Sequence, residues 1–248
     1  MYCERILRHF PAKSITGRNI FAPFDRAMYD FAPTIKPLSK MKKTLYLLIA
    51  LLAANTVLAQ NIDLPAPQKS GGMPLMDALA KRSTSREFDS RELSSQQISS
   101  LLWACDGINR SNGKRTAPSA RNFQETDICV IMKSGAYVYD ATSNKLNLAV
   151  AGDLRSFAGT QAFVTNAPVT LVYVADLARM GKSGVEEKKN YAYADVGFIS
   201  QNAYLFCASE GLVTGVRASV DRKALASKLK LRADQMIILA QSAGYAKP

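Results

Sequence analysis

The clearest helical pattern in the chain follows Ser94. Ser94 and Gln97 have the spacing of a capping box, and Leu93 and Ile98 have the spacing of a hydrophobic staple. Four apolar residues then recur on one helical face, namely Ile98, Leu101, Leu102 and Cys105. The pattern therefore predicts an amphipathic helix that begins after Ser94 and ends at Gly107.

From residue 74 onwards, helical and extended patterns alternate. Helices are predicted at Pro74 to Ala80, at Tyr191 to Glu210, and after Asp221. Strands are predicted at four apolar runs: Thr126 to Met132, Ala136 to Tyr139, Pro168 to Ala175 and Met236 to Ala240. Asn109 to Asn122 is rich in turn-forming residues and is long enough for a binding loop.

The helix predicted at Tyr191 to Glu210 is apolar almost all round and stops at Gly211. A helix without a polar face is typical of a protein core. We therefore expect it to be buried.

An export signal is predicted inside the chain, at residues 41–59. Lys42 and Lys43 precede an uncharged apolar run, and Val57-Leu58-Ala59 resembles a cleavage site. The run is about thirteen residues long, shorter than the roughly 18 to 20 residues that span a bilayer. We expect a cleaved signal peptide, an exported protein and no stable membrane anchor, with an uncleaved anchor as the alternative.

The chain then divides into four parts. Residues 1–40 show no helical or strand period and are predicted to be a non-native or disordered extension, with a genuine basic leader as the alternative. Residues 60–72 have the composition of a linker. Residues 73–248 are predicted to form one domain, which is large enough for a single hydrophobic core.

The net charge changes when the first 59 residues are set aside. The full chain carries 32 basic and 20 acidic residues, a net charge of +12. The part after Ala59 carries 23 basic and 17 acidic residues, a net charge of +6. No Lys/Arg stripe interleaved with aromatic residues occurs, so we expect no nucleic-acid partner.

The positions of histidine and cysteine limit the catalytic and metal-binding chemistry that the protein can perform. The single histidine, His9, precedes the predicted signal, so His-dependent nucleophiles and His-ligated metals lack their central residue. Three cysteines follow residue 59, each in an apolar stretch: Cys105, Cys129 and Cys207. Their spacing resembles no metal site, so we expect no metal and interpret them as buried thiols, with one disulfide as an open alternative.

Two basic, hydroxyl-rich segments carry the candidate chemistry. They are Lys81-Arg82-Ser83-Thr84-Ser85-Arg86 and Pro118-Ser119-Ala120-Arg121-Asn122. A guanidinium pairs bidentately with phosphate oxygens, and hydroxyl and amide groups supply neutral hydrogen bonds. Together the segments indicate a site for an anionic cofactor, although any one of these arginines could be a solvated surface charge.

Four motifs in order resemble landmarks of the nitroreductase family. They are residues 80–88, the loop 118–124 with its Pro-Ser-x-x-Asn-x-Gln pattern, residues 194–202 of the predicted long helix, and residues 209–212 at its end. The resemblance covers residues 74–246, and the branch it matches best contains the SagB-type thiazole- and oxazole-forming dehydrogenases. It implies an α+β, three-layer fold with a mixed, mainly antiparallel central sheet flanked by helices. It also implies an FMN cofactor and a homodimer.

The resemblance assigns roles to matched residues. Arg82 and Arg86 would hold the FMN phosphate and the flavin N1/C2 edge, with added hydrogen bonds from Ser83 and Thr84. Lys247 is the one candidate to replace the basic C-terminal tail that some relatives use on the phosphate.

Two further segments would surround the flavin ring. Asn122 would lie at the pyrimidine edge, in the same loop as Gln124. Four residues would pack near the isoalloxazine, often from the partner subunit: Pro118, Ser119, Ala120 and Arg121. The backbone of a second set would face flavin N5: Val216, Arg217, Ala218 and Ser219.

A bound flavin would carry the redox chemistry, so no catalytic side chain is required. We therefore expect an FMN-dependent oxidoreductase that transfers a hydride or electron pair to or from a nitro compound, a quinone or a peptide-derived ring. The alternative is an exported flavin- or ligand-binding protein with little turnover, because nicotinamide reductants are chiefly intracellular.

Overall fold

The computed structural model describes residues 59–248. The predicted extension at residues 1–40 and the predicted signal peptide up to residue 58 lie outside the described residues. Within residues 59–248, no helix has both the length and the apolar character needed to cross a membrane.

Seven strands form one sheet in the order β1-β4-β3-β2-β5-β7-β6. Their bounds are β1 (Ile62–Asp63), β2 (Thr126–Met132), β3 (Gly135–Asp140), β4 (Lys145–Ala151), β5 (Val169–Asp176), β6 (Val213–Arg217) and β7 (Gln235–Gly244). Every neighbouring pair of these strands is antiparallel, so the described sheet lacks the parallel pair that a mixed sheet would contain. The central strand β5 is buried along its whole length, as its continuous apolar run predicts.

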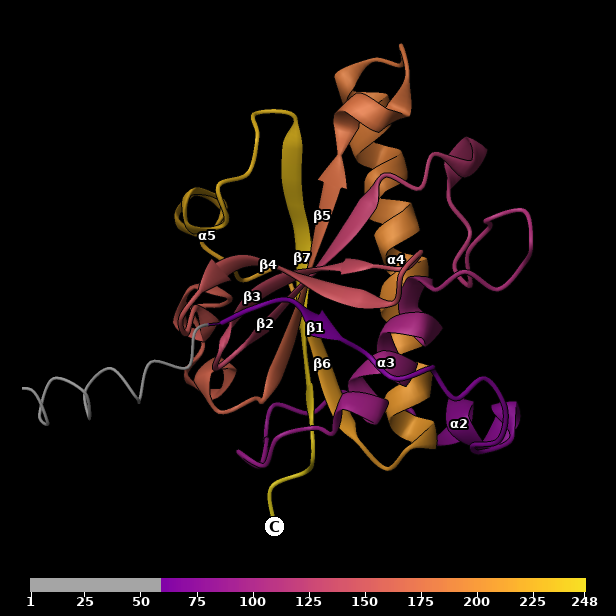
Figure 1. Ribbon diagram of the computed structural model, residues 1–248, viewed down its shortest axis with the longest axis vertical. Coiled ribbons are helices and arrows are strands. Elements are labelled where there is room, and N and C mark those ends of the chain that lie inside the picture. Colours follow the sequence, from indigo (N-terminus) through magenta and orange to yellow (C-terminus); the bar gives the residue numbers. More distant parts are fainter. Residues whose placement is uncertain (1–58) are drawn as a thin grey trace, which may run out of the picture. The chain divides into compact units, whose positions relative to one another are not determined.

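Helices cover both faces of this sheet. Their bounds are α2 (Leu75–Lys81), α3 (Ser95–Asp106), α4 (Val185–Ser209) and α5 (Arg222–Leu229), with short 3-10 turns at Ala120–Asn122, Arg155–Phe157, Ala162–Thr165 and Leu177–Met180. Figure 1 shows α3 and α4 on one side of the sheet and α5 on the other. Neighbouring residues of β5 point to opposite sides, so Tyr173 packs in one hydrophobic core and Val172 in the other. The predicted three-layer α+β fold is confirmed.

The local signals of three helices are confirmed. Ser94 Oγ accepts the Gln97 amide at 3.2 Å, and Gln97 Oε1 accepts the Ser94 amide at 3.0 Å, which completes the capping box of α3. The Asp221 carboxylate accepts the Ala224 amide at 2.9 Å and caps α5. α2 ends at Lys81, the first residue of the basic segment and one residue after the predicted end of the helix.

The long helix α4 differs from its prediction. It begins at Val185 rather than at Tyr191, and only one of its faces is buried. Tyr193 and Phe198 are 47% and 48% exposed. The prediction of a helix buried all round is wrong, because apolar residues also line the outward face of α4.

Three strands lie where no strand is predicted from the apolar runs. β1 lies inside residues 60–72, the segment predicted as a linker, and pairs with β4. Along β4 buried positions alternate with more exposed ones, and β6 contains both Gly215 and Arg217. Val216 and Arg217 are therefore sheet residues rather than loop residues.

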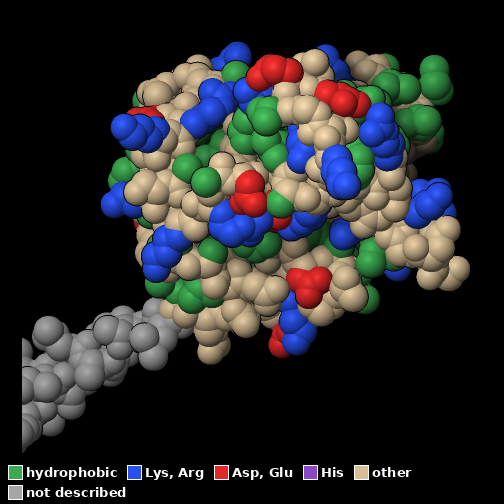
Figure 2. All heavy atoms as spheres, turned by 90° about the horizontal axis from the view of Figure 1, so that it is seen from above, with side chains coloured by type: hydrophobic (Ala, Val, Ile, Leu, Met, Phe, Trp, Pro, Cys, Tyr) green, Lys and Arg blue, Asp and Glu red, His purple; other side chains and the backbone are tan. Residues whose placement is uncertain are grey.

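The cysteines match their interpretation. Cys105, Cys129 and Cys207 are buried and unpaired, which confirms the reading as buried thiols. On the face shown in Figure 2, Lys and Arg side chains are scattered among acidic and uncharged groups.

Candidate functional site

The predicted phosphate segment, residues 81–86, runs from the end of α2 across β6. The Ser85 amide donates to Thr214 O at 2.9 Å. A Cβ on Gly215 would lie 2.6 Å from Ser85 O, so the close crossing of the two backbones requires glycine here. β6 therefore fixes the position of the segment.

Tyr204 of α4 joins the segment to β6. Its hydroxyl lies 2.8 Å from Thr84 Oγ1 and accepts the Val216 amide at 3.0 Å. The guanidinium carbon of Arg82 lies 5.3 Å from the centre of the Tyr204 ring, within cation–π distance. Tyr204 thus holds Arg82, Thr84 and Val216 in one cluster, and sequence reasoning missed it because its role depends on contacts distant in sequence.

The C-terminal residues pair with the chain that follows the basic segment. Phe88 forms a β-bridge with Ala246, and the Lys247 amide lies 3.4 Å from Glu87 O. The backbone of Lys247 therefore lies next to Glu87, the residue that follows the basic segment.

The cations of this cluster have no internal counter-charge. Within residues 59–248, no carboxylate forms an ion pair with the side chains of Lys81, Arg82, Arg86 or Lys247. Several cations with no internal partner favour the binding of an external anion. The residues present therefore fit a phosphate group.

The second predicted segment, residues 118–124, lies against the N-terminal half of α4. The Ala120 amide donates to Asp195 Oδ2 at 2.9 Å, and the Gln124 amide donates to Ser119 Oγ at 3.0 Å. Arg121 is 3.2 Å from the Glu187 carboxylate, so its charge already has a partner. Three of its residues have positive φ angles although none is glycine: Arg121, Asn122 and Gln124.

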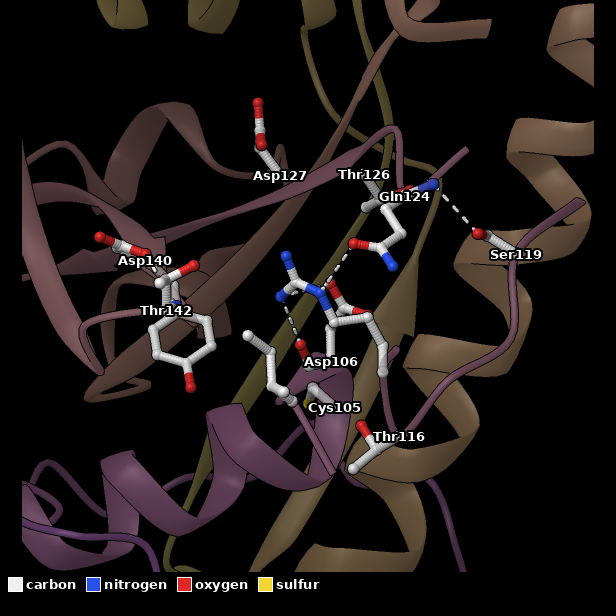
Figure 3. A network of polar contacts seen from close by, with 12 residues as sticks. Cys105, Asp106, Thr116, Ser119, Gln124, Thr126, Asp127, Asp140 and Thr142 are labelled. Carbon is white, nitrogen blue, oxygen red and sulfur yellow. Dashed lines mark hydrogen bonds and ion pairs between the residues drawn. The ribbon is translucent and has the colours of Figure 1, made fainter. Parts of the chain in front are cut away.

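Arg115 holds the end of this loop. Its guanidinium donates to Gln124 Oε1 at 3.2 Å and to Asp106 O at 2.8 Å. Figure 3 shows Asp106 and Gln124 on either side of this guanidinium, and Ser119 bonded to Gln124. Burial raises the pKa of Asp106 to about 7, although Arg115 opposes the shift.

The two predicted segments contact different parts of α4. Residues 118–124 meet the helix at Asp195, whereas residues 81–86 meet it at Tyr204, roughly 13 Å further along at helical rise. The two segments therefore meet α4 at separate points along its length.

The predicted N5 segment is only partly available to a ligand. The Val216 amide is already bonded to Tyr204, and Arg217 points into the core. Ala218 and Ser219 follow β6 and are exposed, and Ser219 Oγ lies 2.6 Å from Thr160 Oγ1. Ala218 and Ser219 are thus the members of this set that lie at the surface.

Arg217 is a buried cation with no carboxylate partner among the described residues. Its guanidinium donates to Ala158 O at 2.8 Å and to Ser242 Oγ at 2.9 Å. Burial lowers the pKa of Arg217 to about 10. The Arg217 side chain therefore packs between the sheet and residues 158–163, whereas the prediction for this residue concerned its backbone N–H.

Known proteins resemble this chain in both sequence and fold. The family model described as the Nitroreductase family matches residues 79–245. A crystal structure from Ralstonia eutropha JMP134, of a protein proposed to be a nitroreductase, is 42% identical. It superposes with a TM-score of 0.73, covering 77% of this chain and 91% of that chain.

Two further relatives are more distant. A Methanocaldococcus jannaschii protein proposed to be a nitroreductase is 30% identical over 150 residues, which are 56% of this chain and 76% of the relative. The NADPH:FMN oxidoreductase of Vibrio harveyi, solved with NAD+, is 19% identical with a TM-score of 0.54, and the match covers 70% of this chain and 69% of that one. The family model spans both basic segments, α4 and β6, and on this match the chain belongs to the nitroreductase family of oxidoreductases.

Proposed function

We propose that this protein is an FMN-dependent oxidoreductase that transfers a hydride or an electron pair to or from a small organic substrate. Nitro compounds, quinones and peptide-derived rings are the substrate classes, the last because of the resemblance to SagB-type dehydrogenases. The observation that carries the proposal is the cluster of unpaired cations on residues 81–86, next to Lys247 and β6.

The chain's own residues would bind and orient the cofactor. Arg82 and Arg86 would bind the phosphate, with Ser83 and Thr84 as neutral donors. The cation of Arg82 would also stabilise negative charge at the N1/C2 edge. When bound, FMN would supply the electron-pair chemistry, so that no catalytic side chain is needed.

Reconstitution with FMN tests the proposed function. The purified domain, residues 60–248, is expected to become yellow with FMN, to keep the flavin through desalting, and to pass electrons from a chemical reductant to a quinone or nitroarene. Visible absorbance records both uptake and reoxidation. A protein that takes up no flavin would contradict the cofactor proposal, and one that holds flavin without turnover would favour the binding-protein alternative.

We further propose that the active form is a homodimer. Two neighbouring helices expose apolar side chains: Leu75, Met76 and Leu79 on α2, and Tyr193 and Phe198 on α4. Small residues, Ala194 and Gly197, lie between the aromatic side chains of α4 and would allow close helix approach. The resemblance, which places the Pro118 to Arg121 stretch against the flavin of the partner subunit, supports the same arrangement, because each site would then take one segment from each subunit.

We also propose export after cleavage following Ala59. The supporting pattern is the order of Lys42-Lys43, the apolar run and the small residues before Gln60. Mass spectrometry of the protein from its native envelope fraction is expected to show Gln60 as the first residue. An intact Met1, or recovery from the cytosol alone, would contradict export and would favour an intracellular, nicotinamide-driven enzyme.

A further inference from the structure

Glu125 is a buried acid that the proposed chemistry does not use. It lies between the loop 118–124 and β2, and its side chain is 0% exposed. Thr126 Oγ1 lies 3.4 Å from Oε1, whereas Oε2 has no hydrogen-bond partner among the described residues. A buried carboxylate with an unpartnered oxygen is costly, so the group requires a proton or a partner.

The nearest candidate partner is a second carboxyl group, that of Asp195 on α4. Asp195 is 3% exposed and, together with Glu125 and Ser119, it lines a cavity of about 10 Å³. Because both carboxyl groups line this small cavity, each affects the ionisation of the other. Two adjacent carboxyl groups cannot both ionise at low cost, and they commonly share one proton.

Arg115 lines the same cavity as this pair, but its charge is matched by Asp106. From α3 and its loop, Asp106 faces Arg115, and the two form an ion pair at 3.6 Å. From β2 and the turn after β5, Asp127 pairs with Arg179 at 2.7 Å, and Arg179 also contacts Asp176. Both neighbouring guanidinium groups are thus matched by their own carboxylates, and a proton is the remaining way to neutralise Glu125 and Asp195.

We propose that Glu125 is a positioning residue for the loop 118–124: its protonated carboxyl donates to Asp195, whose other contact holds the Ala120 amide. Burial raises the pKa of Glu125 to about 6 and also raises the pKa of Asp195. When Glu125 ionises, it repels the carboxylate that holds Ala120. Three positive-φ residues in the loop add backbone strain, which favours release once this contact weakens.

The raised pKa of Glu125 determines how the stability of the closed loop changes with pH. Glu125 has an ordinary value of 4.5 and a folded value of about 6, so the stabilisation is complete below 4.5 and is lost as the pH rises through 6. The shift corresponds to a change of about 30-fold in the equilibrium between the closed and open loop. The effect of this loop on a bound flavin rests on the proposed function.

Hydrogen–deuterium exchange of residues 118–124, measured without FMN and corrected for intrinsic exchange, tests the proposal. In the wild type, protection of this segment is expected to fall about 8-fold between pH 5 and pH 7.5, less than the full change of about 30-fold because at pH 5 Glu125 in the open loop would already be largely ionised. Glu125→Gln keeps a donor toward Asp195 at every pH, so its loop should stay protected throughout. Glu125→Leu provides no donor and should be poorly protected at every pH.

Two comparisons make the result decisive. Asp140→Asn removes a carboxylate that accepts hydrogen bonds from Thr142 and Ser143 at the end of β3, away from Ser119 and Gln124 in Figure 3, and should retain the wild-type pH profile. A flat profile in the wild type, or a Glu125→Gln profile that still follows the wild type, would overturn the proposal even if Glu125→Leu does not fold. Failure to bind FMN would instead remove the proposed function and leave the exchange result standing.

Discussion

Replacing Arg82 with alanine is expected to weaken FMN binding by about 10- to 150-fold. A charge-assisted hydrogen bond contributes roughly 1.5 to 3 kcal/mol, and each 1.4 kcal/mol is tenfold in affinity. Arg82 has no carboxylate partner within residues 59–248, and it is positioned beside β6 by the Tyr204 ring. Titration of FMN fluorescence against wild type and variant measures the difference directly.

A matched control is Lys228→Ala. Lys228 also lies over an aromatic ring, 4.9 Å from the centre of Phe157, but on α5 at the opposite face of the sheet. Its removal should leave FMN affinity unchanged. Equal affinities for the wild type and the Arg82 variant would remove Arg82 from the phosphate site, and equal losses for both variants would indicate an effect of net charge alone.

Phe198→Glu is expected to weaken the homodimer by about 100-fold or more. Phe198 is 48% exposed on the outward face of α4, where the proposed interface would bury it. In a two-fold dimer the substitution enters twice, and like charges brought together in an interface cost several kcal/mol. Sedimentation velocity over a range of concentrations would show the shift to monomer, and FMN should be lost with the dimer.

Ala233→Glu is the matched control, since it adds the same charge to an exposed site in the connection between α5 and β7. It should leave the dimer intact. A Phe198→Glu protein that remains dimeric would move the interface away from α4. A monomeric variant with full FMN affinity would contradict a flavin site shared between subunits.

Elements with strong local signals were predictable from the sequence. The capping box fixes the start of α3, because the two hydrogen bonds link residues only three apart. The apolar run of β5 predicts its burial on both faces, and the β2–β3 hairpin follows from two strand patterns around a short turn. The basic segment at residues 81–86 was identifiable because its basic and hydroxyl side chains are consecutive in the sequence.

Elements that depend on partners distant in the sequence were not predictable from the sequence. β6 contains a glycine and an arginine, so its pattern is that of a loop, yet pairing with β7 makes it a strand. α4 shows apolar residues on nearly every side, and only its packing decides which face is buried. The sequence alone could not separate a core face from an exposed apolar face, because both have the same composition.

The sequence by itself determined the family resemblance, the three-layer fold class, the limits of the capped helices and the basic segment that carries the proposed phosphate site. The tertiary structure decided that Tyr204 joins Thr84 to Val216, that Arg217 faces the core, and that Glu125 and Asp195 line one buried cavity. The physical reason is sequence separation. Caps and strand periods arise between near neighbours, whereas these contacts join residues brought together only by the packing of α4 against the sheet and the neighbouring loops.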